Sequence, residues 1–234
     1  MKNKILTSLL GVFIVVLIIT FSIGLPIYVR PFYYAQVDLY IADYHVSQGE
    51  SWGFEPVSAD EIKDAFNEVM DYLTIPGNEF GTGKLPYRDW TKDHFADCKF
   101  LFDLNIICFI VAFIGAAVLI ILNKCKVFDL WYPFGMNISF YSGVGTIGIF
   151  GILGGLIAID FDTAFTVFHA IFFPGKENWV FHPLYDRIIT ILPQDFFMSC
   201  AILIFSSIIL LCIGCICSGL IDKYKERDKK DTEI

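Results

Sequence analysis

The stretch from Leu104 to Leu122 reads LNIICFIVAFIGAAVLIIL and contains no charged side chain. This length and composition match the roughly 20 mainly apolar residues that an α-helix needs to cross a bilayer. Three further runs have the same character, at 5–29, 138–159 and 196–221. The sequence therefore predicts an all-α integral membrane protein with four transmembrane helices, forming a single membrane domain over residues 1–234.

The composition agrees with this class and excludes others. Hydrophobic residues make up 56% of the chain and charged residues only 18%, whereas ordinary soluble domains carry about 25% charged residues. A net charge of -8 argues against a nucleic-acid partner. The seven cysteines show neither a disulfide framework nor zinc-site spacing. The first apolar run has no small-residue cleavage site, so we expect a retained anchor rather than a signal peptide.

The basic residues predict how the chain is oriented. Nine of the 17 lysines and arginines lie at the amino terminus, in 123–137 and in 222–234. Short cytoplasmic segments are enriched in such residues, so we expect both termini, this loop and this tail to be cytoplasmic. The loops 30–103 and 160–195 then face outward. Since the helix centres hold no ionisable group, ion transport is disfavoured.

Both outer loops are predicted to contain short amphipathic or interfacial helices. Ser58 and Glu61 form a capping box that begins an amphipathic helix ending near Leu73. From Thr91 the chain runs into the second span without a helix breaker, which predicts one continuous helix. In the second loop, aromatic residues surround His169 and indicate a segment at the membrane interface.

Two histidines lie at matching offsets from their spans. His94 precedes the second span by ten residues, and His169 follows the third span by ten residues. If both helices continue outward, a rise of ~1.5 Å per residue places each imidazole roughly 15 Å beyond its apolar run. The two rings should then lie within roughly 4 to 8 Å of each other and could exchange protons with one substrate. We expect His45 to be solvated in a polar loop, and His182 to be an ordinary loop residue.

Other chemistries are less well supported. A metal site could combine His94, Asp97, His169 and Asp162, but no HExxH or HxH spacing is present. The outer-loop serines lie outside any nucleophile-elbow context; they are Ser47, Ser51 and Ser58. We therefore expect neither a metal nor a cofactor. In the third span, glycines including Gly151-x-x-x-Gly155 predict close helix packing, or alternatively a groove for an acyl chain.

Several motifs together resemble one known family. They are HFADCKxLFD at 94–103, FHxIFFPGKxNW at 168–179, DxII at 186–189 and LPxxFF at 192–197. They are similar to those of the four-helix membrane proteins of Gram-positive bacteria that include the lipoprotein intramolecular transacylase, Lit. The likeness extends from the first span to the last. It departs at His182, where we expect an acidic or amide residue.

The resemblance implies an acyltransferase of the bacterial cell membrane with its active site on the extracytoplasmic side. Such an enzyme moves the sn-2 acyl chain of an S-diacylglyceryl cysteine to the α-amino group of the same cysteine, giving a lyso-form lipoprotein. Its partners are diacylated lipoproteins and membrane lipid. His94 and His169 match the family's functional histidines.

The chemistry of this reaction suggests roles for further residues. The α-amino group is largely protonated at neutral pH and needs a base before it attacks an ester. The tetrahedral oxyanion needs a donor, for which a protonated second imidazole, the Trp179 indole and Arg88 are candidates. The expected supporting or substrate-binding residues are Asp97, Arg88, Asp162, Trp179 and Asn178. The alternative is a non-catalytic four-helix protein that binds lipid or a partner membrane protein.

Overall fold

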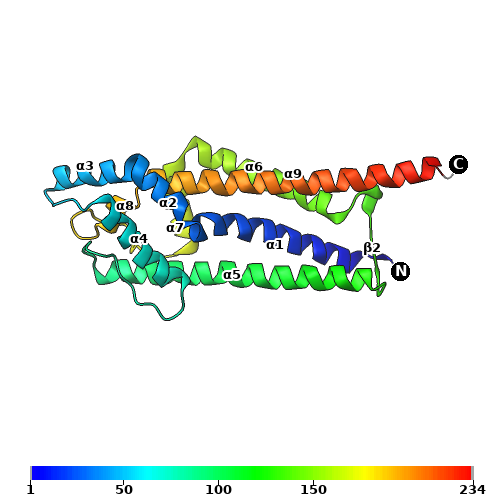
Figure 1. Ribbon diagram of the computed structural model, residues 1–234, viewed down its shortest axis with the longest axis horizontal. Coiled ribbons are helices and arrows are strands. Elements are labelled where there is room, and N and C mark those ends of the chain that lie inside the picture. The colour runs from blue at the N-terminus through cyan, green and yellow to red at the C-terminus, as the bar shows by residue number, and fades with distance from the viewer. Residues whose placement is uncertain (1, 233–234) are drawn as a thin grey trace. The chain divides into compact units, whose positions relative to one another are not determined.

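The structure is a computed structural model that describes residues 2–232, and helices dominate it (Figure 1). The elements are β1 (Lys2–Asn3), α1 (Lys4–Tyr28), α2 (Arg30–Gln36), a π-helix (Val37–Ile41), α3 (Ala42–Trp52), α4 (Ala59–Thr74), α5 (Asp89–Lys124), β2 (Asp129–Leu130), a 3-10 turn (Pro133–Gly135), α6 (Ile138–Ile159), α7 (Phe161–Phe172), α8 (Ile188–Ile191) and α9 (Gln194–Thr232). The strands β1 and β2 form a two-residue parallel pair. The predicted all-α class is confirmed.

Within residues 2–232, four helices are long and apolar enough to cross a membrane. They are Lys4–Tyr28, Asp89–Lys124, Ile138–Ile159 and the Gln194–Lys225 part of α9. Most of their apolar residues are not covered by other parts of the protein, as expected for helices that face lipid. The prediction of four transmembrane helices is confirmed, and the second and fourth helices extend well beyond their apolar runs.

The chain divides into two compact units, which are described separately. The first unit comprises residues up to 23, 105–159 and those from 203 onward. In it, α1 runs beside α5 (Figure 1), and Leu10 of α1 packs against Ala116 and Leu119 of α5. A second cluster joins Ile18, Ile208 and Cys212. Cys212 is fully buried, so it acts as a small apolar packing residue.

The α6 glycines pack differently from the expected pattern. A Cβ on Gly143 would lie 2.8 Å from the Cys212 carbonyl oxygen, and one on Gly154 would lie 3.1 Å from the Phe205 ring. Positions 151 and 155 instead face open space. Close approach of the helix backbones therefore occurs at Gly143, and the prediction that the Gly151-x-x-x-Gly155 pair mediates close packing is wrong.

The second unit comprises residues 24–104 and 160–202. Tyr33 of α2 stacks on Phe66 of α4 with ring centroids 3.6 Å apart. Its hydroxyl donates a hydrogen bond to the Ile191 carbonyl oxygen at 2.7 Å. Because all of these groups are buried, the contacts join α2, α4 and α8 into one core.

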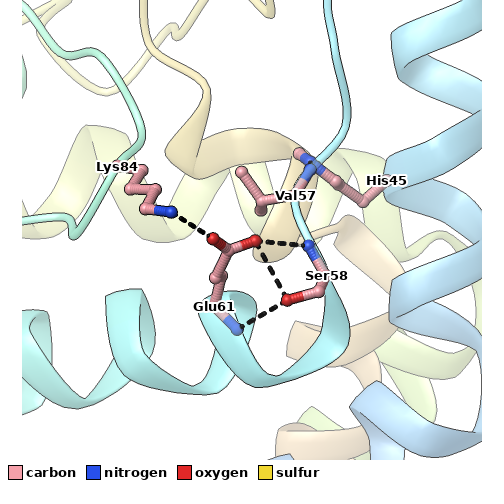
Figure 2. A network of polar contacts seen from close by, with 5 residues as sticks. All are labelled: His45, Val57, Ser58, Glu61 and Lys84. Atoms are coloured by element: carbon pink, nitrogen blue, oxygen red, sulfur yellow. Dashed lines mark hydrogen bonds and ion pairs between the residues drawn. The ribbon is translucent and has the colours of Figure 1, made fainter.

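The helix α4 begins as the sequence predicts. The Ser58 hydroxyl accepts a hydrogen bond from the Glu61 backbone N–H, and the Glu61 carboxylate accepts one from the Ser58 N–H. Figure 2 shows Glu61 between Ser58 and Lys84, which adds an ion pair at 2.5 Å. The predicted capping box is confirmed.

His45 is fully buried in α3, so the prediction that it is solvated is wrong. Its Nε2 accepts a hydrogen bond from the Val57 backbone N–H at 3.1 Å, and Figure 2 shows these two residues side by side. Its Nδ1 lies 2.7 Å from the Thr190 hydroxyl, which itself donates to the Arg187 carbonyl oxygen. Nδ1 therefore carries the proton. Burial, assisted by the positive charge of Arg187, lowers the pKa of His45 to about 4.

The helices that carry the two candidate histidines differ. The helix α5 runs without interruption from Asp89 to Lys124, which confirms the predicted continuous helix. On the third span, however, α6 ends at Ile159 and α7 begins separately. Asp160 caps α7 by accepting a hydrogen bond from the Thr163 N–H at 3.0 Å. The assumption that the third span extends as one helix to His169 is therefore wrong.

Candidate functional site: a buried pair of histidines

His94 on α5 and His169 on α7 lie together in the second unit. Their ring centroids are 5.9 Å apart and the rings are inclined by only 26°. Both side chains are buried, and His94 precedes the apolar stretch that begins at Leu104. The predicted proximity of the two rings is confirmed, although α7 starts as a helix of its own.

The tautomer of His169 follows from its backbone contact. Its Nδ1 lies 2.7 Å from the Phe165 carbonyl oxygen, one turn earlier in α7. A carbonyl oxygen only accepts hydrogen bonds, so Nδ1 carries the proton and Nε2 keeps its lone pair. Burial lowers the pKa of His169, and the hydrogen bond to Phe165 partly opposes this. At neutral pH His169 is a neutral imidazole with one nitrogen able to accept a proton.

Aromatic residues hold the His169 ring. The Trp179 indole stacks on it, with ring centroids 4.3 Å apart and ring planes inclined by 26°. The centroid of the Phe165 ring lies 4.4 Å from that of the imidazole. The indole N–H of Trp179 donates to the Lys176 carbonyl oxygen at 3.1 Å. Trp179 therefore orients the imidazole, while its only N–H donor is already engaged within the loop.

His94 is also neutral at physiological pH. Burial, with a smaller contribution from the neighbouring His169, lowers its pKa to about 4. A protonated imidazole at this position would therefore be costly before substrate binds. Its Nε2 lies 3.5 Å from the Cys98 sulfur, and its Nδ1 is buried without a hydrogen-bond partner in the structure. A buried polar atom without a partner is uncommon and often marks a functional position.

A short loop after α7 is bound to α5 beside the histidine pair. Lys176 Nζ donates to Asp97 Oδ1 at 2.5 Å, and Asn178 Nδ2 donates to Asp97 Oδ2 at 3.3 Å. The carboxylate thus fixes the orientation of the Asn178 amide, whose Oδ1 is buried without a hydrogen-bond partner in the structure. Sequence reasoning did not include Lys176 among the site residues, because nothing in one sequence indicates a contact with a carboxylate 79 residues away.

Two of the expected supporting residues, Arg88 and Asp162, have partners other than the two histidines. Arg88 forms an ion pair with the fully buried Asp186, which also accepts from Thr91 Oγ1 at 2.5 Å and from the His182 N–H at 3.2 Å. Asp162 accepts a hydrogen bond from Gln194. The Arg88 guanidinium therefore faces Asp186 with its Nε and Nη2 groups. The carboxylates of Asp97 and Asp162 have separate partners, and residues 2–232 contain no cluster of three or more side chains suited to a metal ion.

The four apolar helices define the chain as a multi-pass α-helical membrane protein, and its paired neutral imidazoles are suited to proton transfer. The chain belongs to the family described as lipoprotein intramolecular transacylase Lit, whose family model matches residues 8–197. The predicted resemblance is confirmed. Members of this family are transacylases.

Solved structures support the same fold. The membrane-integral lipoprotein intramolecular transacylase Lit from Bacillus cereus matches with a TM-score of 0.82 and 24% identity, over 96% of this chain and 97% of that one. A variant of that protein with a histidine-to-arginine substitution matches with a TM-score of 0.75 and 23% identity, over 97% and 94% of the two chains. No curated protein sequence matches the chain significantly.

Proposed function

We propose that this protein is an O-to-N acyltransferase that acts on diacylated lipoproteins. It moves the sn-2 acyl chain of an S-diacylglyceryl cysteine to the α-amino group of the same cysteine. The ester C–O bond breaks, an amide C–N bond forms, and the amine proton passes to the sn-2 oxygen of the glycerol. Membership of the Lit family supports the transacylase class, and the histidine pair supports the proton transfers.

The observation that carries the mechanism is the tautomer of His169. Its Nδ1–H is bound to Phe165, so its Nε2 can take the proton from the attacking amine and return it to the leaving alkoxide. Because burial lowers its pKa, the ring is neutral at the pH at which it must act as a base. Donor ester and acceptor amine belong to one molecule, so their alignment supplies much of the rate enhancement.

The neutral His94 is the best candidate for the oxyanion donor. The Trp179 indole N–H is bound to the Lys176 carbonyl oxygen and is not available without rearrangement. Arg88 is held in an ion pair with Asp186 through Nε and Nη2. His94 Nδ1 is buried and unpaired, so a ring N–H at this nitrogen would have no competing partner. Asn178 Oδ1, also unpaired, is an acceptor suited to the α-amino group.

The proposed orientation places both termini in the cytoplasm and the histidine pair outside. Lipoproteins present their lipidated cysteine at the outer surface of the cell membrane, and the clustered lysines and arginines of the termini and of 123–137 favour this orientation. The acidic excess of the outer loops would favour the cationic amine terminus of the substrate.

Substitution of either histidine by asparagine tests the mechanism. General acid-base assistance is typically worth about 10²- to 10⁴-fold, so His94→Asn and His169→Asn should each insert normally but form almost no lyso-lipoprotein. The measurement is mass spectrometry of lipopeptides from cells that express each variant.

His182→Asn is the matched control, because His182 accepts a local N–H from Leu184 and an amide oxygen can replace that contact. It should retain full activity. Normal lyso-lipoprotein formation by either variant of the pair would contradict the acid-base assignment. If the wild-type chain itself leaves lipopeptides unchanged, the non-catalytic binding function is favoured instead.

A further inference from the structure

Cys98 lies one helical turn after His94 on α5, and its sulfur is 3.5 Å from His94 Nε2. No step of the mechanism above uses this contact. Residues four apart on a helix share a face, so α5 itself holds the thiol against the imidazole. The contact gives one of the two ring nitrogens of His94 a hydrogen-bond partner.

The chemistry of the two groups permits a hydrogen bond in which the thiol is the donor. Burial raises the pKa of the Cys98 thiol to about 12, so the sulfur keeps its proton at any physiological pH. A protonated thiol is a weak donor, and a ring nitrogen with a free lone pair is a suitable acceptor. An S–H group that donates to Nε2 leaves the ring proton on Nδ1.

The other ring nitrogen of His94 is left open. Nδ1 is buried without a hydrogen-bond partner in the structure, so a proton held there is not engaged by a neighbouring side chain. Asp97 binds the NH₂ group of Asn178, whose amide oxygen is likewise unpaired.

We propose that Cys98 is a positioning residue that donates its S–H to His94 Nε2 and so holds His94 in the Nδ1–H tautomer. The ring then presents an N–H, and not a lone pair, to the acyl oxygen on which negative charge develops. This inference rests on the proposed acyl transfer and deepens it by separating the roles of the two histidines. His169 has Nδ1 tied to the backbone and offers a lone pair, while His94 has Nε2 tied to the thiol and offers a proton donor.

The tautomer can be measured without reference to activity. In protein labelled with ¹⁵N at histidine, the ring nitrogen shifts distinguish a protonated from an unprotonated nitrogen, and His94→Asn identifies the His94 signals by their loss. At neutral pH wild-type His94 should show Nδ1 protonated and Nε2 unprotonated. Cys98→Ala should move the signals toward a mixture of tautomers. A wild-type His94 protonated at Nε2 would overturn the proposal.

Kinetics separate hydrogen bonding from packing. Cys98→Ser and Cys98→Ala have similar sizes, and only serine retains a donor. Losing a complete oxyanion donor costs about 10²- to 10³-fold, and losing only the tautomer preference should cost less, so we expect Cys98→Ala to lower kcat roughly tenfold with KM unchanged. Cys98→Ser should restore most of this loss. Cys108→Ala, ten residues along the same helix, is the control and should match the wild type.

Each kinetic outcome has a defined meaning. Wild-type kcat in Cys98→Ala, or a Cys98→Ser as slow as Cys98→Ala, would overturn the donor role of the thiol. Failure of the proposed function would be a different result, namely a wild-type protein that forms no lyso-lipoprotein. In that case the nitrogen shifts of His94 still decide whether Cys98 sets its tautomer.

Discussion

The imidazoles of this chain differ in how many of their nitrogens the fold uses. Both nitrogens of His45 are hydrogen-bonded, to Thr190 and to the Val57 N–H. Protonation of Nε2 would remove the acceptor of the Val57 N–H and place a second N–H donor against it. His94, in contrast, keeps a buried nitrogen without a partner in the structure. At the scale of single residues, a histidine with both ring nitrogens hydrogen-bonded is therefore assigned a structural role. A histidine with a buried, unpaired ring nitrogen is a candidate catalytic residue.

His45 should make the second unit sensitive to acid. Its pKa is about 4 in the fold and about 6.5 in an unfolded chain. Between these values the unfolded state binds more protons, so the free energy of unfolding falls as pH decreases, by up to about 3 kcal/mol for this group. His94 acts in the same direction.

Thermal unfolding of the purified protein between pH 7 and about pH 5 measures this effect. His45→Gln should be less stable than the wild type at neutral pH but should lose less stability on acidification. His182→Gln serves as the control and should follow the wild type. An unchanged pH dependence in His45→Gln would contradict the assignment.

The Asp97–Lys176 pair should matter for activity more than for stability. The Lys176 side chain is 48% exposed and that of Asp97 is 25% exposed, and such pairs contribute only about 0 to 1 kcal/mol to stability. The pair nevertheless fixes the loop that holds Asn178 and Trp179 at the histidines. Asp97→Asn and Lys176→Met should each lower kcat, by less than loss of either histidine, with almost unchanged melting temperatures.

The double variant distinguishes coupling from independent effects. Residues that act through one contact couple by about 0.5 to 3 kcal/mol in a double-mutant cycle. Asp97→Asn combined with Lys176→Met should therefore be little worse than the more severe single variant. Fully additive losses would mean that the two residues support the site separately.

At the scale of elements, the turn after α7 depends on a single glycine. Gly175 has a φ of 72°, a left-handed conformation that costs other residues roughly 1 to 2 kcal/mol. A Cβ there would meet no atom within 4 Å, so strain and not a clash is the expected penalty. Gly175→Ala should lower both stability and activity, and Gly175→Asn should do so less, because asparagine tolerates this conformation.

Gly145→Ala is the control for this pair of variants. Position 145 is also free of neighbours but lies within α6 in an ordinary helical conformation, where alanine is favoured over glycine. Activity and melting temperature can be measured on all three proteins. Equal effects of alanine and asparagine at position 175 would argue against backbone strain as the cause.

The elements that sequence predicts well are those whose signals are local. Uncharged runs predict spans, and Ser58 with Glu61 predicts the start of α4. The helices from Arg30 to Trp52 cannot be predicted in this way, because their stability comes from contacts with distant residues, such as Tyr33 with Phe66 and with the Ile191 carbonyl oxygen. For the same reason the sequence around His45 suggests a solvated loop, although this residue is buried.

The candidate site likewise contains residues that can be predicted from the sequence and residues that cannot. The two histidines were identified from their scarcity, their offsets from the spans and the surrounding motifs. Lys176 could not be identified, since its role depends on a turn at Gly175 and a partner on α5. The engagement of Arg88 with Asp186 likewise joins residues 98 apart in the chain.

At the scale of the whole molecule, the topology remains a prediction with a direct test. Glu50→Cys should react with a membrane-impermeant thiol reagent applied to intact cells, and Lys229→Cys should not. The background carries Cys125→Ser and Cys217→Ser, because both of these native thiols are exposed. With only Cys217 replaced, native Cys125 provides an internal reporter for the 123–137 loop and should resist the reagent. The reverse labelling pattern would place the histidine pair in the cytoplasm.

The distribution of the second unit along the chain has a consequence for biosynthesis. Its first part, 24–104, is synthesised before the second and third spans are complete, and His169 follows only afterwards. Until then His94 has no partner imidazole, and Tyr33 lacks the Ile191 carbonyl oxygen that its hydroxyl binds. A ribosome that stalls before α7 therefore leaves in the membrane a fragment with one histidine of the pair. On the proposed function, such a fragment cannot catalyse acyl transfer in the lipoproteins around it.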